Sequence, residues 1–328
     1  MNKIIFSIIF TFLFINNSFA DQIRMAYLEV KEVQKNNFDI IFKSPLKFNR
    51  KLDIKPEFPQ ECHKTSISKN QFVNKAYLST FKIECTNGLL GQTIYVNGLK
   101  QIKTDLLLKL DLLDSNAQTV LISKDKNSYT IAKQPSAWQV SKTYTLLGIE
   151  HILHGFDHLL FVLSLLLIVK NFRTLVWTIT AFTLAHSITL AGVTFGYLKL
   201  PQQPVEAVIA LSIMFLAMEV LHKQRGINGI ASKFPWIVSF TFGLLHGFGF
   251  AGALAEIGLP EQSVPLALLF FNVGVESGQL MFVSVVISLG FIIKKLLQTK
   301  QLNIAKTIMV YGIGSMASFW FVERVSAF

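Results

Sequence analysis

The second half of the chain is a series of apolar runs, each close to the length that crosses a lipid bilayer. From Tyr144 onward, runs of about 20 residues with few charges alternate with short loops that carry lysine and arginine. A backbone inside a bilayer must satisfy its hydrogen bonds internally, so each run is predicted to be an α-helix. We expect a polytopic membrane domain over residues 144–328, with six transmembrane helices at about 146–169, 174–196, 204–222, 235–257, 264–293 and 304–325.

The first 20 residues have the pattern of a secretory signal peptide. Lys3 gives a positive start, residues 4–15 form an apolar core too short for a comfortable span, and Ser18-Phe-Ala20 matches a small-residue cleavage site. We predict cleavage after Ala20, and an uncleaved membrane anchor is the alternative. Residues 21–140 would then form a separate extracytoplasmic domain.

Residues 21–140 contain short runs that partly alternate between apolar and polar side chains, with Asn-Gly pairs at predicted turns. This pattern predicts a small β-sandwich-like domain, followed by a linker over residues 134–145. Its two cysteines, Cys62 and Cys85, are expected to form a disulfide, because disulfides persist outside the cytoplasm. Metal binding with nearby His63 is the alternative, although two sulfurs and one imidazole match a zinc site weakly.

The formal charge of +11 does not indicate nucleic-acid binding, because the cations lie in the N-terminal region and in short loops. Positive loops beside membrane helices usually face the cytoplasm. The first, third and fifth loops carry the cations, whereas the loops between them carry only Lys199 with Glu256 and Glu261. This asymmetry predicts a protein of the inner membrane whose N-terminal domain and C-terminus are both extracytoplasmic.

Ionisable residues are concentrated at the start of the first apolar run, between Gly148 and His158. Glu150, His151, His154, Asp157 and His158 follow the spacing i, i+1, i+4, i+7 and i+8. In a continuous helix they would cover an arc of roughly 120° and share one face. Charged groups in a membrane helix almost always face the protein interior or a water-filled path. This face is therefore the first candidate functional site.

Three other apolar runs place polar side chains at a similar depth, namely His186, His246, and Asn272 with Glu276. Imidazole and carboxylate together suit a first-row transition metal such as nickel, cobalt or zinc. Alone, His186 or His246 could instead bond a carbonyl of a neighbouring helix. Taken together, the predicted metal ligands are His151, His154, Asp157, His158, His186, His246 and Glu276.

The segment His151-Ile-Leu-His-Gly-Phe-Asp-His158 resembles the signature His-Pro-x-x-Gly-x-Asp-His of the HupE/UreJ family, with Ile152 in place of the proline. The similarity extends over roughly residues 144–325 and is closer to a branch with an extracytoplasmic N-terminal domain. Three further motifs support it, Ala185–Thr189, Leu245–Ala251 and Phe271–Glu276. The resemblance implies a metal permease connected with nickel supply for hydrogenase and urease.

Two functions of different classes fit these residues. The first is a nickel or cobalt permease driven by a gradient, since the sequence contains no Gly-x4-Gly-Lys-Ser/Thr element. The second is an intramembrane zinc hydrolase acting on a lipid or membrane peptide, with Glu276 as general base and Ser187 or Asn272 stabilising the oxyanion. An accessory membrane protein with a structural metal is a third. A periplasmic partner for the N-terminal domain is a further expectation.

Overall fold

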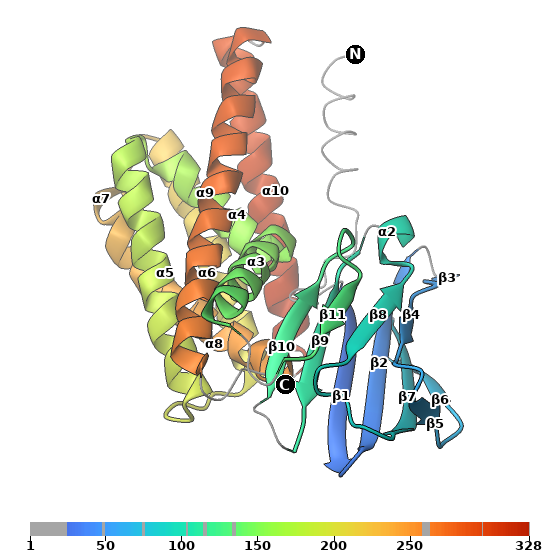
Figure 1. The fold of residues 1–328 in the computed structure, drawn as a ribbon. Helices are drawn as coiled ribbons and strands as arrows, with labels where there is room; N and C mark the ends of the chain where they lie inside the picture. The colour runs from blue at the N-terminus through green and yellow to red at the C-terminus, as the bar shows by residue number, and fades with distance from the viewer. Residues whose placement is uncertain are drawn as a thin grey trace.

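The computed structural model describes residues 25–327, except for 48–49, 74–75, 103, 114–116, 133–135, 258–262 and 297. The expected signal peptide, residues 1–20, lies outside the described residues. Within them, the strands occupy the N-terminal part of the chain and the long helices follow (Figure 1). The expected order, a β-rich region followed by a helical region, is confirmed.

In the residues that the structure describes, the β-rich region contains two sheets. The larger has the strand order β10-β9-β1-β2-β7-β5, with β3 added to β2 and β6 added to β7, and the smaller has the order β11-β8-β4. All neighbouring strands are antiparallel except β1 and β9, which are parallel. The strands are β1 (Ala26–Gln34), β2 (Asn37–Lys47), β3 (Arg50–Lys51), β4 (Lys55–Glu57), β5 (Cys62–Lys64), β6 (Lys69–Val73), β7 (Ala76–Cys85), β8 (Thr93–Asn97), β9 (Leu106–Asp111), β10 (Gln118–Ile122) and β11 (Ser128–Thr130).

Both sheets contribute to one hydrophobic core. Alternate residues of β1, such as Leu28 and Val30, are fully buried and pack in the same cluster as Ile94 and Val96 of β8. Period-two burial of this kind is what a strand with one covered face produces. The short helix α2 (Leu99–Ile102) adds Leu99 to the same core.

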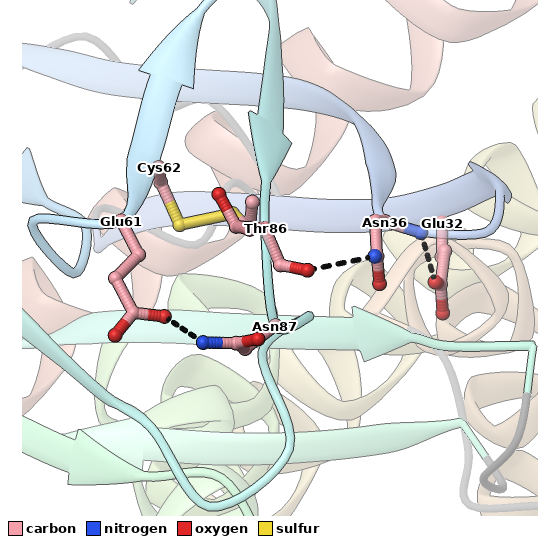
Figure 2. The surroundings of a disulfide bond; sticks show 7 residues. Glu32, Asn36, Glu61, Cys62, Thr86 and Asn87 are labelled. Carbon is pink, nitrogen blue, oxygen red and sulfur yellow. Dashed lines mark hydrogen bonds between the residues drawn. A yellow bond between two sulfur atoms is a disulfide. The ribbon is translucent and has the colours of Figure 1, made fainter.

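Cys62 and Cys85 form the predicted disulfide, with an S–S distance of 2.10 Å. The two residues are direct partners in the pairing of β5 with β7. Figure 2 shows hydrogen bonds around it, including the side chain of Asn87 donating to Glu61 over 2.6 Å. The disulfide therefore links the edge strand β5 to β7 in the larger sheet.

The helical region starts earlier than expected. Ser136 caps α3 by accepting a hydrogen bond from the backbone N–H of Gln139, and α3 begins at Ala137. Residues 137–145 of the expected linker are therefore helical. The helices are α3 (Ala137–His154), α4 (Phe156–Ile168), α5 (Phe172–Thr194), α6 (Gln202–Gln224), α7 (Ile230–Lys233), α8 (Pro235–Ile257), α9 (Val264–Leu296) and α10 (Thr299–Val325).

Three helices in the described part of the chain, α5, α6 and α9, are long and apolar enough to cross a membrane. The bent pair α3 and α4 gives a fourth such unit if the two are counted together. Helices α8 and α10 occupy the positions expected for the fourth and sixth spans but are not among these candidates. A membrane protein is supported, while the count of six spans stays a prediction.

Glycines let pairs of helices approach closely. A Cβ on Gly247 of α8 would lie 2.1 Å from Thr189 Oγ1 and 2.5 Å from the carbonyl oxygen of His186 on α5. A Cβ on Gly148 of α3 would lie 2.1 Å from the carbonyl oxygen of Phe271 on α9. Because these glycines have no side chain, α8 can approach α5 closely, and α3 can approach α9 in the same way. Small residues commonly have this role between membrane helices.

The β-rich region packs directly against the helical region through α3. Leu107 of β9 belongs to the same buried cluster as Val140, Tyr144 and Leu147 of α3, and that cluster continues to Phe271 of α9. The helix that leads into the polar stretch is therefore fixed by both parts of the molecule.

Candidate metal centre

The polar stretch between Glu150 and His158 is not one helix. Helix α3 ends at His154, α4 begins at Phe156, and the two are bent by 74° at Gly155. The prediction of a single helix face is therefore wrong. The chain leaves helical geometry at Gly155, where a side chain has little room: a Cβ would lie 2.8 Å from the carbonyl oxygen of His151 and 3.0 Å from His158 Nδ1.

The bend brings the end of α3 against the start of α4. His151, Asp157 and His158 are all buried, and the ring centroids of His151 and His158 are 4.7 Å apart. Asp157 lies in the first turn of α4. Free backbone N–H groups and the helix dipole favour a carboxylate at that position. Three polar groups are thus held in the apolar interior by the break itself.

Helices α5 and α8 complete the cluster. His186 of α5 and His246 of α8 are fully buried. The five side chains form two groups that could hold a metal ion, His151–His158–His186 and Asp157–His158–His246. Within each group the ligand atoms lie within 4.8 Å of one another, and His158 belongs to both.

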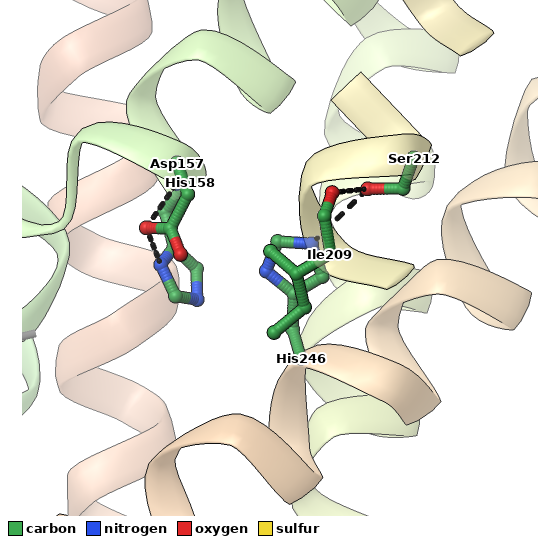
Figure 3. Close-up of polar contacts among 5 residues, drawn as sticks. All are labelled: Asp157, His158, Ile209, Ser212 and His246. Atoms are coloured by element: carbon green, nitrogen blue, oxygen red, sulfur yellow. Dashed lines mark hydrogen bonds and ion pairs between the residues drawn. The ribbon is translucent and has the colours of Figure 1, made fainter. Parts of the chain in front are cut away.

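Asp157 orients the shared histidine. Its Oδ1 accepts hydrogen bonds from the backbone N–H of His158 over 2.8 Å and from His158 Nδ1 over 3.0 Å (Figure 3). An imidazole that donates from Nδ1 presents the lone pair of Nε2. A carboxylate behind a ligating histidine is a common way to fix the ring and increase its basicity.

Asn272 of α9 orients His186 in the same manner. The amide nitrogen of Asn272 donates to the carbonyl oxygen of Leu268 over 2.8 Å, so its Oδ1 is directed to His186 Nδ1, 3.0 Å away. His186 must then carry its proton on Nδ1. Its Nε2 is buried and has no hydrogen-bond partner among the described residues. The lone pair of Nε2 is available for a metal.

Ser212 of α6 stands behind His246. Its hydroxyl donates to the carbonyl oxygen of Ile209 over 2.6 Å, and its Oγ lies 3.5 Å from His246 Nε2, a long contact (Figure 3). Because that hydroxyl proton is already engaged, Ser212 can only accept from Nε2–H. Nδ1 of His246 is buried without a hydrogen-bond partner in the described part of the chain. It is therefore the nitrogen that can ligate.

Four buried phenylalanines pack around the imidazoles. The ring centroid of Phe250 lies 3.9 Å from that of His151, and those of Phe182 and Phe161 lie 5.0 and 5.3 Å from that of His246. Phe271 stacks on Phe250 with the rings 8° from parallel. Such an apolar shell limits solvent access and tunes a metal site.

Three other residues from the sequence prediction lie outside both groups. His154 is exposed, and its Nδ1 is 3.0 Å from the carbonyl oxygen of Glu150. Glu276 of α9 is half-buried and accepts a 2.6 Å hydrogen bond from Thr180. Ser187 donates to the carbonyl oxygen of Thr183 over 2.7 Å, within its own helix.

Three features of the site have weak, partial or no signals in the sequence. Ser212 is one serine in an apolar run, and most serines in such helices bond only their own backbone. The orienting role of Asn272 is partly foreseeable, since it lies four residues before Glu276 on one helix face. The phenylalanine shell could not be distinguished from ordinary packing.

The match to known families agrees with this arrangement. The family model described as HupE / UreJ protein matches residues 125–324, which is more than half of the chain and includes every residue of both groups. No curated protein matches the chain. This chain belongs to the HupE/UreJ family.

Proposed function

We propose that this protein is a permease that carries a divalent transition metal, nickel or cobalt, across the inner membrane. The observation that carries the proposal is the pair of ligand groups sharing His158, built from α3, α4, α5 and α8. The family is associated with nickel and cobalt uptake, which supports the same conclusion. Imidazole and carboxylate ligands suit these metals.

Two overlapping groups favour movement of an ion over permanent storage. An ion held by His151, His158 and His186 can exchange two of its ligands for Asp157 and His246 without leaving His158. Coordination at each stage replaces water that the ion loses on entering the apolar shell. His158 is therefore the ligand whose removal should be most damaging to transport.

Glu276 is the proposed next binding residue for the ion after the two ligand groups. It lies one helical turn beyond Asn272 on α9, about 6 Å along the axis, and Thr180 of α5 fixes its carboxyl group. A carboxylate there could receive the ion from the histidines or accept a proton released when histidine binds metal.

The proposed topology has six transmembrane segments, with α3 and α4 together forming the first. The signal peptide would be removed after Ala20, and the loops with lysine and arginine would face the cytoplasm. The disulfide supports an oxidising compartment for the β-rich region. That region and the C-terminus would then be extracytoplasmic, where a periplasmic partner stays a prediction.

The compact triad of three histidines also favours a second candidate, a zinc-dependent hydrolase with water as the fourth ligand. The contacts of the groups that would assist hydrolysis weigh against it. Asn272 holds His186, and the Ser187 hydroxyl is engaged with its own helix, so an oxyanion would have to displace existing bonds.

Uptake into proteoliposomes separates the two functions. The intact chain should accumulate nickel or cobalt in the vesicle lumen, and His158→Ala should abolish accumulation. His154→Ala is the matched control, because it removes an exposed histidine from the same segment and should leave uptake within about twofold. Failure of the intact chain to transport nickel, cobalt or zinc, together with stoichiometric retention of zinc, would favour the hydrolase.

A further inference from the structure

A cavity of about 1120 Å³ lies at the end of the helical region that is remote from the β-rich region. It is formed where the C-terminal ends of α4 and α6 meet the start of α5, the second half of α9 and the first half of α10. In Figure 1, α9 and α10 extend past the ends of the other helices on this side. The cavity is thus open beside them and is separate from the histidine cluster.

The cavity is basic. Lys170, Lys223 and Lys306 line it, and none of its lining residues, all in the described chain, is acidic. Because Lys170 and Lys223 line the same cavity, their like charges repel each other. Lys223 also donates to the carbonyl oxygen of Ile168, which holds its ammonium group at the end of α4. An anion among these lysines would relieve the repulsion, whereas a metal cation would increase it.

The remaining walls divide into a polar part and an apolar part. Asn303 and Thr307 of α10 supply polar groups, and the Thr307 hydroxyl donates to Gln224 of α6 over 3.0 Å. Apolar side chains of α4 and α9, such as Leu166 and Ile287, supply an apolar wall. A ligand that fills this space must combine a negative head with a hydrocarbon body.

We propose that this cavity binds an anionic phospholipid. Its phosphate would sit among the three lysines, and an acyl chain would lie along the apolar wall between α4 and α9. Basic pockets between membrane helices at the cytoplasmic side bind acidic headgroups in this way. The proposal concerns a different site from the metal centre and stands or falls independently of transport.

The test measures lipid bound to the full-length protein after purification in detergent, by native mass spectrometry with phosphatidylglycerol and phosphatidylcholine supplied in equal amounts. The intact chain should retain phosphatidylglycerol preferentially. A triple variant should reduce that retention by about tenfold or more; it combines Lys170→Gln, Lys223→Gln and Lys306→Gln. Because Lys223 also bonds backbone, the double variant at Lys170 and Lys306 serves as a second measurement and should lose most of the preference.

The matched control removes three exposed lysines outside the cavity, by Lys233→Gln, Lys294→Gln and Lys295→Gln. It should keep the lipid preference within about twofold. Equal losses in the cavity and control variants would overturn the proposal in favour of a diffuse surface effect. Binding of inorganic phosphate without any preference between the two lipids would also overturn it, because the site would then recognise a small anion and not a lipid.

Discussion

Asn272→Leu is the substitution that tests the orientation of His186 most sharply. Leucine keeps the approximate size of the side chain but removes the acceptor that lies 3.0 Å from His186 Nδ1. Both residues are buried, His186 completely, so water cannot easily replace the lost acceptor. A buried donor left without its partner costs about 1–3 kcal/mol. The ring can recover that energy by turning or by changing its tautomer, and either change removes Nε2 from the ligand group.

Loss of a group that orients a ligating histidine typically weakens metal affinity by about 10–100-fold. We therefore expect the Kd of Asn272→Leu for nickel to rise by about that factor, equivalent to about 1.4–2.7 kcal/mol. Asn272→Asp keeps an acceptor for His186 Nδ1 but loses the N–H that donates to Leu268, so its affinity should fall less than that of Asn272→Leu. Competition with a chromogenic chelator, on protein in lipid nanodiscs, measures both values.

Ser277→Ala on the same helix is the control, since within the described part of the chain its hydroxyl bonds only the carbonyl oxygen of Val273. Its removal should not alter the Kd. Thermal unfolding without metal shows whether each variant is folded. An unchanged Kd in Asn272→Leu would refute the reasoning, as would equal losses in the leucine and aspartate variants.

Two predictions concern stability. Gly247→Ala should destabilise the protein by about 1–3 kcal/mol, because the new Cβ would lie 2.5 Å from the carbonyl oxygen of His186. Chemical unfolding in detergent measures the free energy. An effect equal to that of Gly290→Ala, whose Cβ would meet no atom of the described residues within 4 Å, would contradict this prediction. Replacing Cys62 and Cys85 by serine should cost about 3 kcal/mol, since the disulfide closes a loop of 23 residues. Chemical unfolding measures this loss as well. An unchanged unfolding midpoint would contradict the prediction, because the disulfide would then not stabilise the β-rich region.

Much of the candidate site was predictable because its chemistry is unusual for a membrane helix. Histidines in long apolar runs are costly, so His151, His158, His186 and His246 stood out without any knowledge of the fold. The disulfide was predictable from the presence of two cysteines behind a predicted signal peptide. The strand-rich and helical regions could also be predicted. Short runs of alternating apolar and polar residues in the N-terminal part give way to apolar runs of about 20 residues after Tyr144.

The break at Gly155 was not predictable from periodicity. The spacing of Glu150 to His158 fits a continuous helix well, and a single glycine inside an apolar run is compatible with a membrane helix. At the bend, a side chain on Gly155 would meet the carbonyl oxygen of His151 and the side chains of Asp157 and His158, and periodicity carries no signal of these contacts. The bend also explains why His154 lies outside the cluster although its spacing matches.

The lysine-lined cavity shows a different limit of the sequence. Its cations come from three separate places, namely the loop after α4 (Lys170), the end of α6 (Lys223) and the first half of α10 (Lys306). In the sequence, each of them only indicates orientation. Their common environment depends on how α9 and α10 pass the ends of the shorter helices. Neither helix length nor hydropathy contains that information.

X-ray absorption spectroscopy of the nickel-loaded protein tests the central claim most directly, since it reports the ligands around the metal itself. The proposed site predicts one tightly bound ion with an imidazole-rich coordination shell. His158→Ala should lose that signal or reduce its imidazole number, while His154→Ala should leave the spectrum unchanged. A spectrum without imidazole ligands, or one that changes with His154 and not with His158, would contradict the assignment.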